Sequence, residues 1–440
     1  MTRIFTKGEI DRLGEKIRTQ SIAIDDETLT ELQFYRTSHK DSLANTFNIL
    51  CSATRKVHAT SIVTFRIKRF ESIIGKLERF QDMRFSRMWD IAGCRCIVRD
   101  NQDVYKLQKL IQNEPLLEIV KVYDYIEKPQ SDGYKSLHLF VKHKCSDIVV
   151  EVQLRSLVDH NWATLVEITD LLFDSKLKEY GENKDLLRFH YLLSTPDKLT
   201  IRDKYEIAKI IQQYNYFEKL SEVFSRNYLK VRKQWFDLQN QNNHRYFLIE
   251  SKKDDVPKIE SFYNFQQAEN HYFNVYKTRQ NANIVLTHLQ TPNYNQISIA
   301  YSNYILTFHT FHSECLQILE SLIVESLENK KYYAFFKNFN LYNGLVFRHI
   351  KNMMTEINEV KDFSLTQKGK KSAKRRKENE WIEDIKKQVN QSNQRGRKLQ
   401  LAVRKAMPSG VFRKFVIKQI IKKISRNYKS KIDSLLANAV

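Results

Sequence analysis

The 440-residue chain contains only 10 glycines and 6 prolines. Both residue types interrupt regular secondary structure, so their scarcity predicts long helices and few elaborate loops. Cysteine is also sparse: Cys51, Cys94, Cys96, Cys145 and Cys315 are too few and too irregularly spaced for a disulfide framework or a four-ligand zinc site. We therefore expect reduced thiols.

Long hydrophobic runs are missing as well. No stretch reaches the ~18 to 20 apolar residues that cross a bilayer, and the first residues, MTRIFTKGEI, lack the apolar core of a signal peptide. Hydrophobic residues make up 42% of the chain and charged residues 28%, as in ordinary globular proteins, which excludes a collagen-like or wholly disordered chain. We expect a soluble, cytoplasmic protein.

Acidic residues are in the minority, with 51 Asp and Glu against 73 Lys and Arg and a net charge of +22. The excess is uneven. Residues 361–440 contain 23 basic and 6 acidic residues, a net charge of +17, whereas the first 360 residues contain 50 and 45, a net charge of +5. A near-neutral body is therefore expected to carry a cationic tail, of the kind that binds anionic partners such as nucleic acids.

Hydrophobic periodicity predicts an α/β domain in residues 1–180. Apolar residues recur at three- and four-residue intervals in 27–50 and 59–80, which is typical of amphipathic helices. Four short β-rich runs follow, at 93–98, 116–126, 137–142 and 148–154, with helical stretches at 104–112 and 157–172. The predicted architecture is a mixed sheet flanked by helices.

The rest of the chain is predicted to form four further segments. A helical connector (181–244) precedes a small second α/β unit (245–310), in which strands at 245–250 and 283–289 enclose a helix at 266–278. A helical segment (311–360) contains helices at 316–328 and 331–357. The tail (361–440) combines a disordered, like-charged linker at 364–377 with a basic amphipathic helix at 411–436.

Residues suited to phosphate binding occur first between Arg66 and Lys76. In a helix, Lys68, Ser72 and Lys76 would share one side, because four residues are slightly more than one turn. Two ammonium groups and a hydroxyl suit the oxygens of a nucleoside triphosphate. A solvated basic helix face would show the same spacing, so this segment alone does not decide between the two interpretations.

Two further segments place polar residues beside predicted strands. In Asp90-Ile-Ala-Gly-Cys-Arg95, a carboxylate opens a short apolar strand, as a capping residue or as a metal ligand. Tyr134 and His138 follow a turn-rich segment and precede another strand. A tyrosine at such a turn serves either as partial packing or as a platform on which a base stacks.

The last segment is Ile148 to Arg155, in which polar and apolar residues alternate. Period two places Glu151, Gln153 and Arg155 on one face of a strand. A strand with one face in solvent would give the same alternation, so the residues gain meaning only together with the other segments.

In this order the segments resemble the synthetase domain of the RelA/SpoT family over roughly residues 28–175. The motifs R-x-K-x-x-x-S-x-x-x-K, D-I-A-G-x-R, D-Y-I-x-x-P, G-Y-x-S-L-H and E-V-Q-L-R are all present. The resemblance implies a nucleotidyltransferase-like α/β fold and transfer of the β,γ-pyrophosphate of ATP to a ribose 3′ hydroxyl. A W-A-T-x-V-E stretch beginning at Trp162 is similar to a subgroup that often has a smaller α/β unit after this domain.

The resemblance also implies a role for each matching residue. For ATP, the adenine would lie between Arg66 and Arg95, and the phosphates would contact Lys68, Ser72 and Lys76. Mg²⁺ would be bound by Asp90 and Glu151, and Glu151 would also help to deprotonate the acceptor hydroxyl. The acceptor base would stack on Tyr134, and acceptor and phosphates would be oriented by His138, Gln153 and Arg155.

One departure bears on the acceptor. Gln130 occupies a position where the family usually has a lysine that faces the acceptor's phosphates. The leading hypothesis is a pyrophosphotransferase that makes guanosine alarmones from GDP or GTP. Gln130 and the basic tail favour an alternative with the same donor chemistry, in which the tRNA 3′ end is the acceptor and the protein is a translation-blocking toxin. A third hypothesis is a non-enzymatic regulatory binding protein. The sequence leaves open the acceptor, an antitoxin or other regulatory partner, and the oligomeric state.

Overall fold

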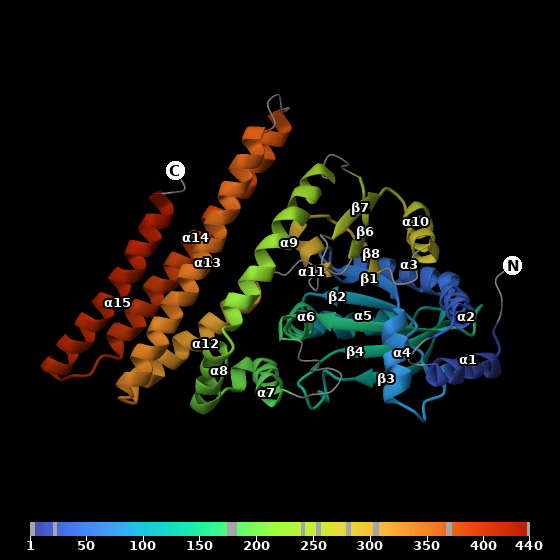
Figure 1. The fold of residues 1–440 in the computed structure, drawn as a ribbon, viewed down its shortest axis with the longest axis horizontal. Coiled ribbons are helices and arrows are strands. Elements are labelled where there is room, and N and C mark those ends of the chain that lie inside the picture. Colours follow the sequence, from blue (N-terminus) through green and yellow to red (C-terminus); the bar gives the residue numbers. More distant parts are fainter. Residues whose placement is uncertain are drawn as a thin grey trace. The chain divides into compact units, whose positions relative to one another are not determined.

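A computed structural model of the chain describes residues 5–20, 24–173, 183–238, 243–251, 257–278, 283–301, 308–366 and 372–437. The chain forms two compact units (Figure 1). Unit 1 consists of Met1–Glu182 and Lys230–Thr307, and unit 2 of Asn183–Leu229 and Phe308–Val440. The chain therefore leaves unit 1, returns to it, and ends in unit 2.

Unit 1 is built on an eight-stranded mixed sheet with the order β3-β4-β5-β2-β1-β8-β6-β7. The strands are β1 (Ile62–Ile67), β2 (Ala92–Val98), β3 (Leu117–Asp124), β4 (Leu137–His143), β5 (Val149–Ser156), β6 (Tyr246–Ser251), β7 (Lys258–Phe262) and β8 (Asn283–Leu289). Within the described strands, β2 and β5 pair in parallel and the other neighbours pair antiparallel. The predicted α/β class and mixed sheet are confirmed.

One face of this sheet is the hydrophobic core of unit 1. Alternate residues of the strands, such as Phe65, Cys94 and Val152, pack against three helices, α3 (Lys40–Val57), α5 (Asn101–Gln112) and α10 (Phe265–Thr278). The intervening residues point to the opposite face, because side chains alternate along a strand. The opposite face is therefore available for polar side chains.

A second, smaller core joins the N-terminal helices of unit 1. It packs α1 (Lys7–Thr19), α2 (Asp26–Thr37) and α4 (Phe70–Arg79) around a short 3₁₀ helix, η1 (Phe85–Arg87). Two more helices complete the unit: α6 (Leu157–Phe173) follows β5 directly, and α11 (Tyr294–Ala300) follows β8. Because α4 belongs to this core, the cluster fixes the helix that carries Ser72 and Lys76.

The prediction of a single helix over 59–80 is wrong. Residues 62–67 form strand β1, and only 70–79 form helix α4. Ile62, Val63, Phe65 and Ile67 are β-branched or aromatic and lie between the two neighbouring strands β2 and β8, so strand pairing prevails over the helical spacing. Likewise, the helix predicted over 27–50 is divided into α2 and α3 at Ser38–His39.

The small α/β unit predicted at 245–310 is not a separate domain. Its helix and both predicted strands are present, together with β7, which the sequence analysis missed. However, β8 pairs with β1, so these strands continue the sheet of unit 1. Pairing removes the exposed edge that β1 would otherwise present, and a three-stranded sheet with one helix would have only a small core of its own.

Unit 2 is helical in the part of the chain that the structure describes. Its helices are α7 (Lys184–Leu193), the 3₁₀ helix η2 (Pro196–Lys198), α8 (Ile201–Gln213), α12 (Phe308–Glu328), α13 (Tyr332–Thr366), α14 (Ser372–Lys405) and α15 (Val411–Ala437), and α9 (Tyr216–Leu238) extends from this unit into unit 1. The predicted basic helix at 411–436 is confirmed as α15. None of the described helices combines the length and apolar character that a bilayer crossing requires.

The disordered linker predicted at 364–377 is wrong for the residues that the structure describes. Residues 364–366 end α13 and residues 372–377 begin the 34-residue helix α14, while 367–371 lie outside the described residues. Lys, Arg and Ala are strong helix formers, and a long helix tolerates like charges that a compact core would not.

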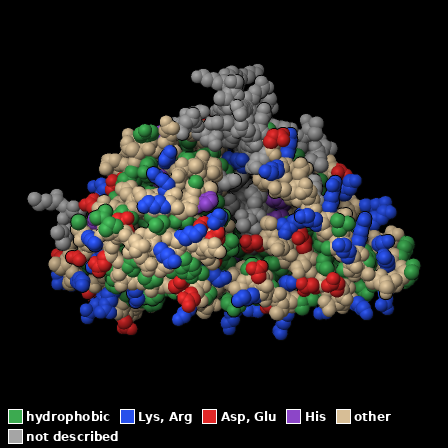
Figure 2. Space-filling view, turned by 180° about the vertical axis from the view of Figure 1, so that it is seen from behind, with side chains coloured by type: hydrophobic (Ala, Val, Ile, Leu, Met, Phe, Trp, Pro, Cys, Tyr) green, Lys and Arg blue, Asp and Glu red, His purple; other side chains and the backbone are tan. Residues whose placement is uncertain are grey.

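Figure 2 shows Lys and Arg side chains spread among Asp and Glu on the face in view.

Gly14 of α1 allows a close helix contact. A Cβ at this position would lie 2.6 Å from the Phe85 Cβ in η1. We expect Gly14→Ala to lower the free energy of unfolding by about 1 to 3 kcal/mol because the helix must move away from Phe85. Urea unfolding measures the change. Gly8→Ala in the same helix is the control, because its nearest neighbour is the flexible end of Arg12 at 3.9 Å. Equal effects of both substitutions would contradict the packing.

Candidate active site

The parallel pairing of β2 with β5 sets the geometry of the candidate site. It aligns Gly93 with Glu151 and Arg95 with Gln153, and antiparallel β4 places His138 beside Gln153. These residues alternate with core residues, so their side chains share the sheet face opposite the hydrophobic core. Arg66 reaches the same face from β1, where it pairs with Gly93. The structure thus brings together residues from four strands.

A carboxylate and two ammonium groups form the first cluster on this face. Lys68 Nζ lies 2.7 Å from Asp90 Oδ2, and Lys76 Nζ lies 2.9 Å from Asp90 Oδ1. Lys68 follows β1, Lys76 belongs to α4, and Asp90 precedes β2. The convergence of Lys68 and Lys76 therefore does not arise from a single helix, as the sequence analysis assumed, but from a strand-to-helix turn.

The remaining ATP-binding candidates lie close by in the fold. Arg66 is an exposed residue of β1, and Ser72 is half-buried on α4, one turn before Lys76. Arg95 is half-buried on β2, where burial, together with Arg155 and Arg66, lowers the pKa of its guanidinium. This part of the sheet is electropositive, as the binding of a polyphosphate requires.

The lysines determine the charge state of Asp90. Burial alone would raise the pKa of this carboxyl, but the charges and hydrogen bonds of Lys68 and Lys76 outweigh it and lower the pKa from 3.8 to about 2. Burial lowers the pKa of Lys68, an effect that its pairing with Asp90 opposes. At neutral pH the cluster is therefore a carboxylate between two ammonium groups, and both of its oxygens are occupied.

Glu151 belongs to a closed ring of five hydrogen-bonded side chains. His138 Nδ1 lies 3.0 Å from Glu151 Oε1, and Gln153 Nε2 donates to Glu151 Oε2 over 3.1 Å. Tyr134 Oη lies 2.8 Å from His138 Nε2. Arg155 closes the ring by donating to Tyr134 Oη at 2.6 Å and to Gln153 Oε1 at 2.9 Å.

The two ends of the ring fix most of its hydrogen-bond directions. Arg155 has donors only and carboxylate Glu151 has acceptors only, so donation runs from Arg155 through Gln153 to Glu151. On the other branch Arg155 donates to Tyr134 and His138 donates to Glu151, and the tautomer of His138 sets the direction between Tyr134 and His138. Burial would raise the pKa of Glu151, but its hydrogen bond to His138 and the charges of His138 and Lys68 together outweigh burial and lower it. Glu151 is therefore an oriented, ionised carboxylate, as a general base must be.

Aromatic rings surround Tyr134. Tyr125 approaches it edge-on at 6.1 Å, and Trp162 of α6 is tilted toward it at 6.5 Å between ring centroids. The Arg155 guanidinium lies 5.1 Å from the centre of the Tyr134 ring. Neither Tyr125 nor Trp162 is among the site residues predicted from the sequence, although Tyr125 is part of the D-Y-I motif and Trp162 opens the W-A-T stretch.

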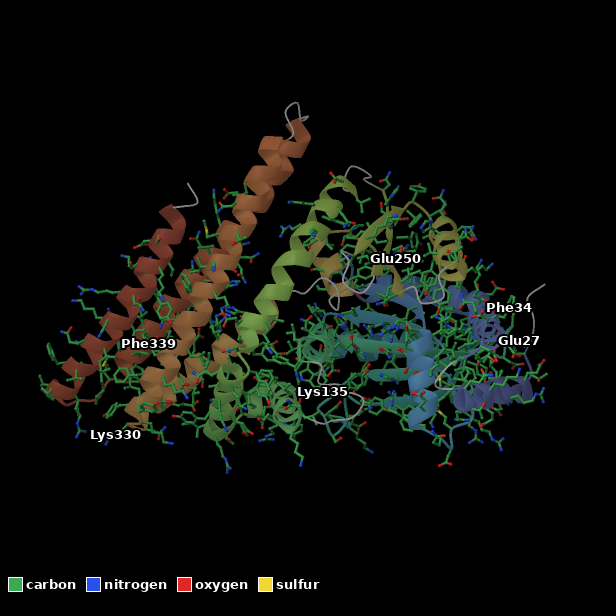
Figure 3. The ribbon with its side chains drawn as sticks, viewed as in Figure 1. Glu27, Phe34, Lys135, Glu250, Lys330 and Phe339 are labelled. Carbon is green, nitrogen blue, oxygen red and sulfur yellow. The ribbon has the colours of Figure 1, made fainter. Side chains whose placement is uncertain are left out.

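A tight turn presents Tyr134 to the site. Gly133 has φ 95°, in the region that side chains disfavour, and its N–H donates to the Gln130 carbonyl at 2.9 Å. The Gln130 side chain is exposed, and so is Lys128. Lys135, labelled in Figure 3, is half-buried and its charge acts on Asp159 of α6.

The carboxylates present fit a magnesium ion that arrives with a nucleotide. Among the described residues, no group of three or more His, Cys, Asp and Glu side chains is arranged to hold a metal ion. Asp90 and Glu151 are near enough for the charge of Asp90 to act on Glu151. Mg²⁺ typically binds one or two carboxylates, substrate phosphates and water, which two acidic side chains and a triphosphate provide.

Part of this sheet matches a known protein family. Residues 65–171 match the region found in RelA/SpoT proteins, which confirms the resemblance there. The chain is 31% identical over 140 residues to GTP pyrophosphokinase YwaC and 27% identical over 125 residues to GTP pyrophosphokinase YjbM, both of Bacillus subtilis (strain 168). These matches cover 28% and 27% of this chain, which spans 66% and 59% of the length of those relatives.

A solved structure shows a weaker likeness. The crystal structure of small alarmone synthetase 2 from Bacillus subtilis has a TM-score of 0.32 and 24% sequence identity, with 42% of this chain and 98% of that chain covered.

The Asp90 cluster predicts a pH-dependent stability. Because the pKa of Asp90 is lower in the folded than in the unfolded protein, its stabilisation is complete above about pH 4 and is lost as the pH falls toward 2. We expect Asp90→Asn to cost about 2 kcal/mol at pH 7 and progressively less in acid. Urea unfolding between pH 7 and pH 3 measures this difference.

Asp82→Asn, at an exposed aspartate, is the matched control and should change stability little at any pH. An Asp90→Asn effect that stayed constant across this pH range would contradict the pairing of Asp90 with the two lysines.

Proposed function

Because residues 65–171 form a region of the RelA/SpoT type, we propose that the chain transfers the β,γ-pyrophosphate of ATP to the 3′ hydroxyl of GDP or GTP. The observation that carries this proposal is the proximity of two features on one sheet face. The Lys68–Asp90–Lys76 cluster suits a polyphosphate, and the ring around Glu151 orients a base. GTP pyrophosphokinase is also the activity named for the two relatives from Bacillus subtilis.

On the donor side, the cations exchange partners. Lys68 and Lys76 bind Asp90 in the absence of nucleotide, and in the proposed complex their ammonium groups move to the ATP phosphates. Arg66 and Arg95 stack on the adenine, and Ser72 donates to a phosphate oxygen. Asp90 and Glu151 would hold Mg²⁺, whose chemistry would be to neutralise charge on the triphosphate. Before ATP binds, Asp90 is ionised, because Lys68 and Lys76 lower its pKa to about 2.

On the acceptor side, Tyr134 stacks on the guanine while His138, Gln153 and Arg155 orient the nucleotide. Glu151 accepts the proton of the 3′ hydroxyl, whose oxygen forms a new bond to the β-phosphorus of ATP. The bond from that phosphorus to the α-phosphate oxygen breaks and AMP leaves with the electron pair. Placing these groups and neutralising the phosphate charge is sufficient for phosphoryl transfer without a covalent intermediate.

The test of the reaction uses the full chain with Mg²⁺ and ATP carrying label at its γ-phosphate. Product with label in a pyrophosphorylated guanosine nucleotide is expected from GDP or GTP. Glu151→Gln should lower the rate at least about 100-fold, since the general base is lost. Glu118→Gln, at an exposed position of β3, is the control and should retain the rate.

If both variants retained the rate, Glu151 would have no part in the mechanism. No labelled product from GDP or GTP would exclude these acceptors, and no labelled product from GDP, GTP or tRNA would refute the pyrophosphotransferase and favour the regulatory binding protein.

The surface of α15 favours a second candidate acceptor, the 3′ end of tRNA. Between Val411 and Ile432 the helix has eight Lys and Arg residues and no Asp or Glu. The cations are exposed, whereas Ile417 is buried, and the Tyr428 hydroxyl reaches the Asn340 carbonyl of α13 at 3.3 Å. A helix that packs on α13 and exposes its cations suits a phosphate backbone. Transfer to tRNA would block translation, and an antitoxin or another regulatory protein would be its expected partner.

This second candidate predicts label in tRNA when tRNA replaces GDP and GTP. Replacing Lys418, Lys422 and Lys429 by glutamine should weaken tRNA labelling several-fold and reduce its dependence on salt, because phosphate contacts release counterions. Substitution of the exposed Lys56, Lys109 and Lys144 removes the same charge from unit 1 and is the control. Absence of label in tRNA would exclude this acceptor.

A further inference from the structure

The turn between β1 and α4 is held by residues from outside the RelA/SpoT region. The Lys68 carbonyl accepts hydrogen bonds from Arg36 Nε of α2 at 3.0 Å and from the Tyr276 hydroxyl of α10 at 3.3 Å. The preceding Ile67 N–H donates to the Tyr272 hydroxyl of α10 at 3.0 Å. A strand-to-helix turn leaves main-chain groups without regular partners, and here α2 and α10 provide them.

Arg36 is the central residue of this arrangement. It has no exposed surface, and burial lowers the pKa of its guanidinium to about 10. Besides the Lys68 carbonyl, it donates to Gln33 Oε1 at 2.8 Å and to the Tyr276 hydroxyl. Its guanidinium lies 4.0 Å from the centre of the Phe70 ring and 4.5 Å from that of Tyr276. Burying a cation is costly unless its donors are paired with good geometry, so the partners of the Arg36 guanidinium tightly constrain its orientation.

The position of Lys68 depends on this turn from both sides. Its N–H donates to the Ile91 carbonyl at 2.8 Å, which ties it to the start of β2, and its carbonyl is held by Arg36 and Tyr276. The ammonium of the same residue lies 2.7 Å from Asp90. A shift of the main chain would therefore move the ammonium relative to Asp90 and to a bound phosphate.

The helix that supplies Tyr276 is itself anchored in the core. Tyr272, Phe273 and Tyr276 are buried on α10, and the rings of Tyr272 and Tyr276 are stacked with 5.7 Å between their centroids. The strand after this helix, β8, pairs with β1, which leads into the Lys68 turn. The segment that extends the sheet thus contacts the phosphate-binding turn through both its helix and its strand.

We propose that Arg36 and Tyr276 are positioning residues, which fix the Lys68 main chain so that its ammonium meets the phosphates of ATP. This inference rests on the proposed function. It gives the strands and helix after the RelA/SpoT region a definite role, as a second support of the ATP side of the site. Neither residue is proposed to contact ATP. Because both position Lys68, which binds the phosphates, their replacement should weaken the affinity for ATP.

The test is Tyr276→Phe, which removes the hydroxyl and retains the ring beside Arg36. Its matched control is Tyr301→Phe, because the buried Tyr301 hydroxyl also donates to main-chain carbonyls, those of Phe247 at 2.8 Å and Val285 at 3.0 Å. Binding of a non-hydrolysable ATP analogue with Mg²⁺ is measured by calorimetry, together with the melting temperature and the KM values for ATP and acceptor.

We expect Tyr276→Phe to weaken analogue binding and raise the KM for ATP about 3- to 10-fold, the range of one lost hydrogen bond. The KM for the acceptor should be unchanged, and both variants should melt at similar temperatures. Arg36→Lys keeps the charge without the forked donors and should weaken ATP binding at least as much; Tyr276→Phe decides the outcome if that variant does not fold.

Equal ATP affinity of Tyr276→Phe, Tyr301→Phe and the unmodified protein would overturn the inference while leaving the proposed function intact. An unmodified protein that binds the analogue but makes no product would refute the proposed reaction, and the binding comparison would still decide the role of Tyr276. An unmodified protein that does not bind the analogue would refute both.

Discussion

The parallel pairing of β2 with β5 is the constraint on which the candidate site depends. It sets Gly93 beside Glu151 and Arg95 beside Gln153, and the alternation of side chains keeps these residues off the core face. A slip of one residue would bury Glu151 and expose Val152, which is fully buried. The apolar core on one face therefore enforces the register of the polar residues on the other.

Within this frame the charges are already paired before substrate binds. Asp90 is flanked by Lys68 and Lys76, and Glu151 receives donors from His138 and Gln153. Such pairing keeps both carboxylates ionised in a partly buried site, since an unpaired charge there would be costly. It also sets a requirement for substrate binding, because the phosphates of ATP must replace the Asp90 oxygens as partners of Lys68 and Lys76. The same interactions that stabilise the folded protein thus prearrange its binding groups.

The sequence predicted those residues of the site that lie within short motifs. The alternation of polar and apolar residues around Glu151 correctly placed the polar ones on one face of a strand, and the strand that begins after Asp90 was also expected. The segment from Arg66 to Lys76 was misassigned to one helix, because a six-residue strand next to a ten-residue helix mixes two periodicities. The supports of Lys68 were not predicted, since Arg36 and Tyr276 are 240 positions apart and neither lies in a motif. Likewise, only strand pairing reveals that β8 extends the first sheet, because the pattern of a strand does not name its neighbour.

In the proposed complex, one sheet face holds the triphosphate with the cations that now bind Asp90. The most direct measurement is a crystal structure of the full chain with Mg²⁺ and a non-hydrolysable ATP analogue. We expect the ammonium groups of Lys68 and Lys76 to leave Asp90 for phosphate oxygens, while the Lys68 carbonyl stays bound to Arg36 and Tyr276. A nucleotide bound elsewhere, with the Lys68–Asp90–Lys76 cluster unchanged, would contradict it.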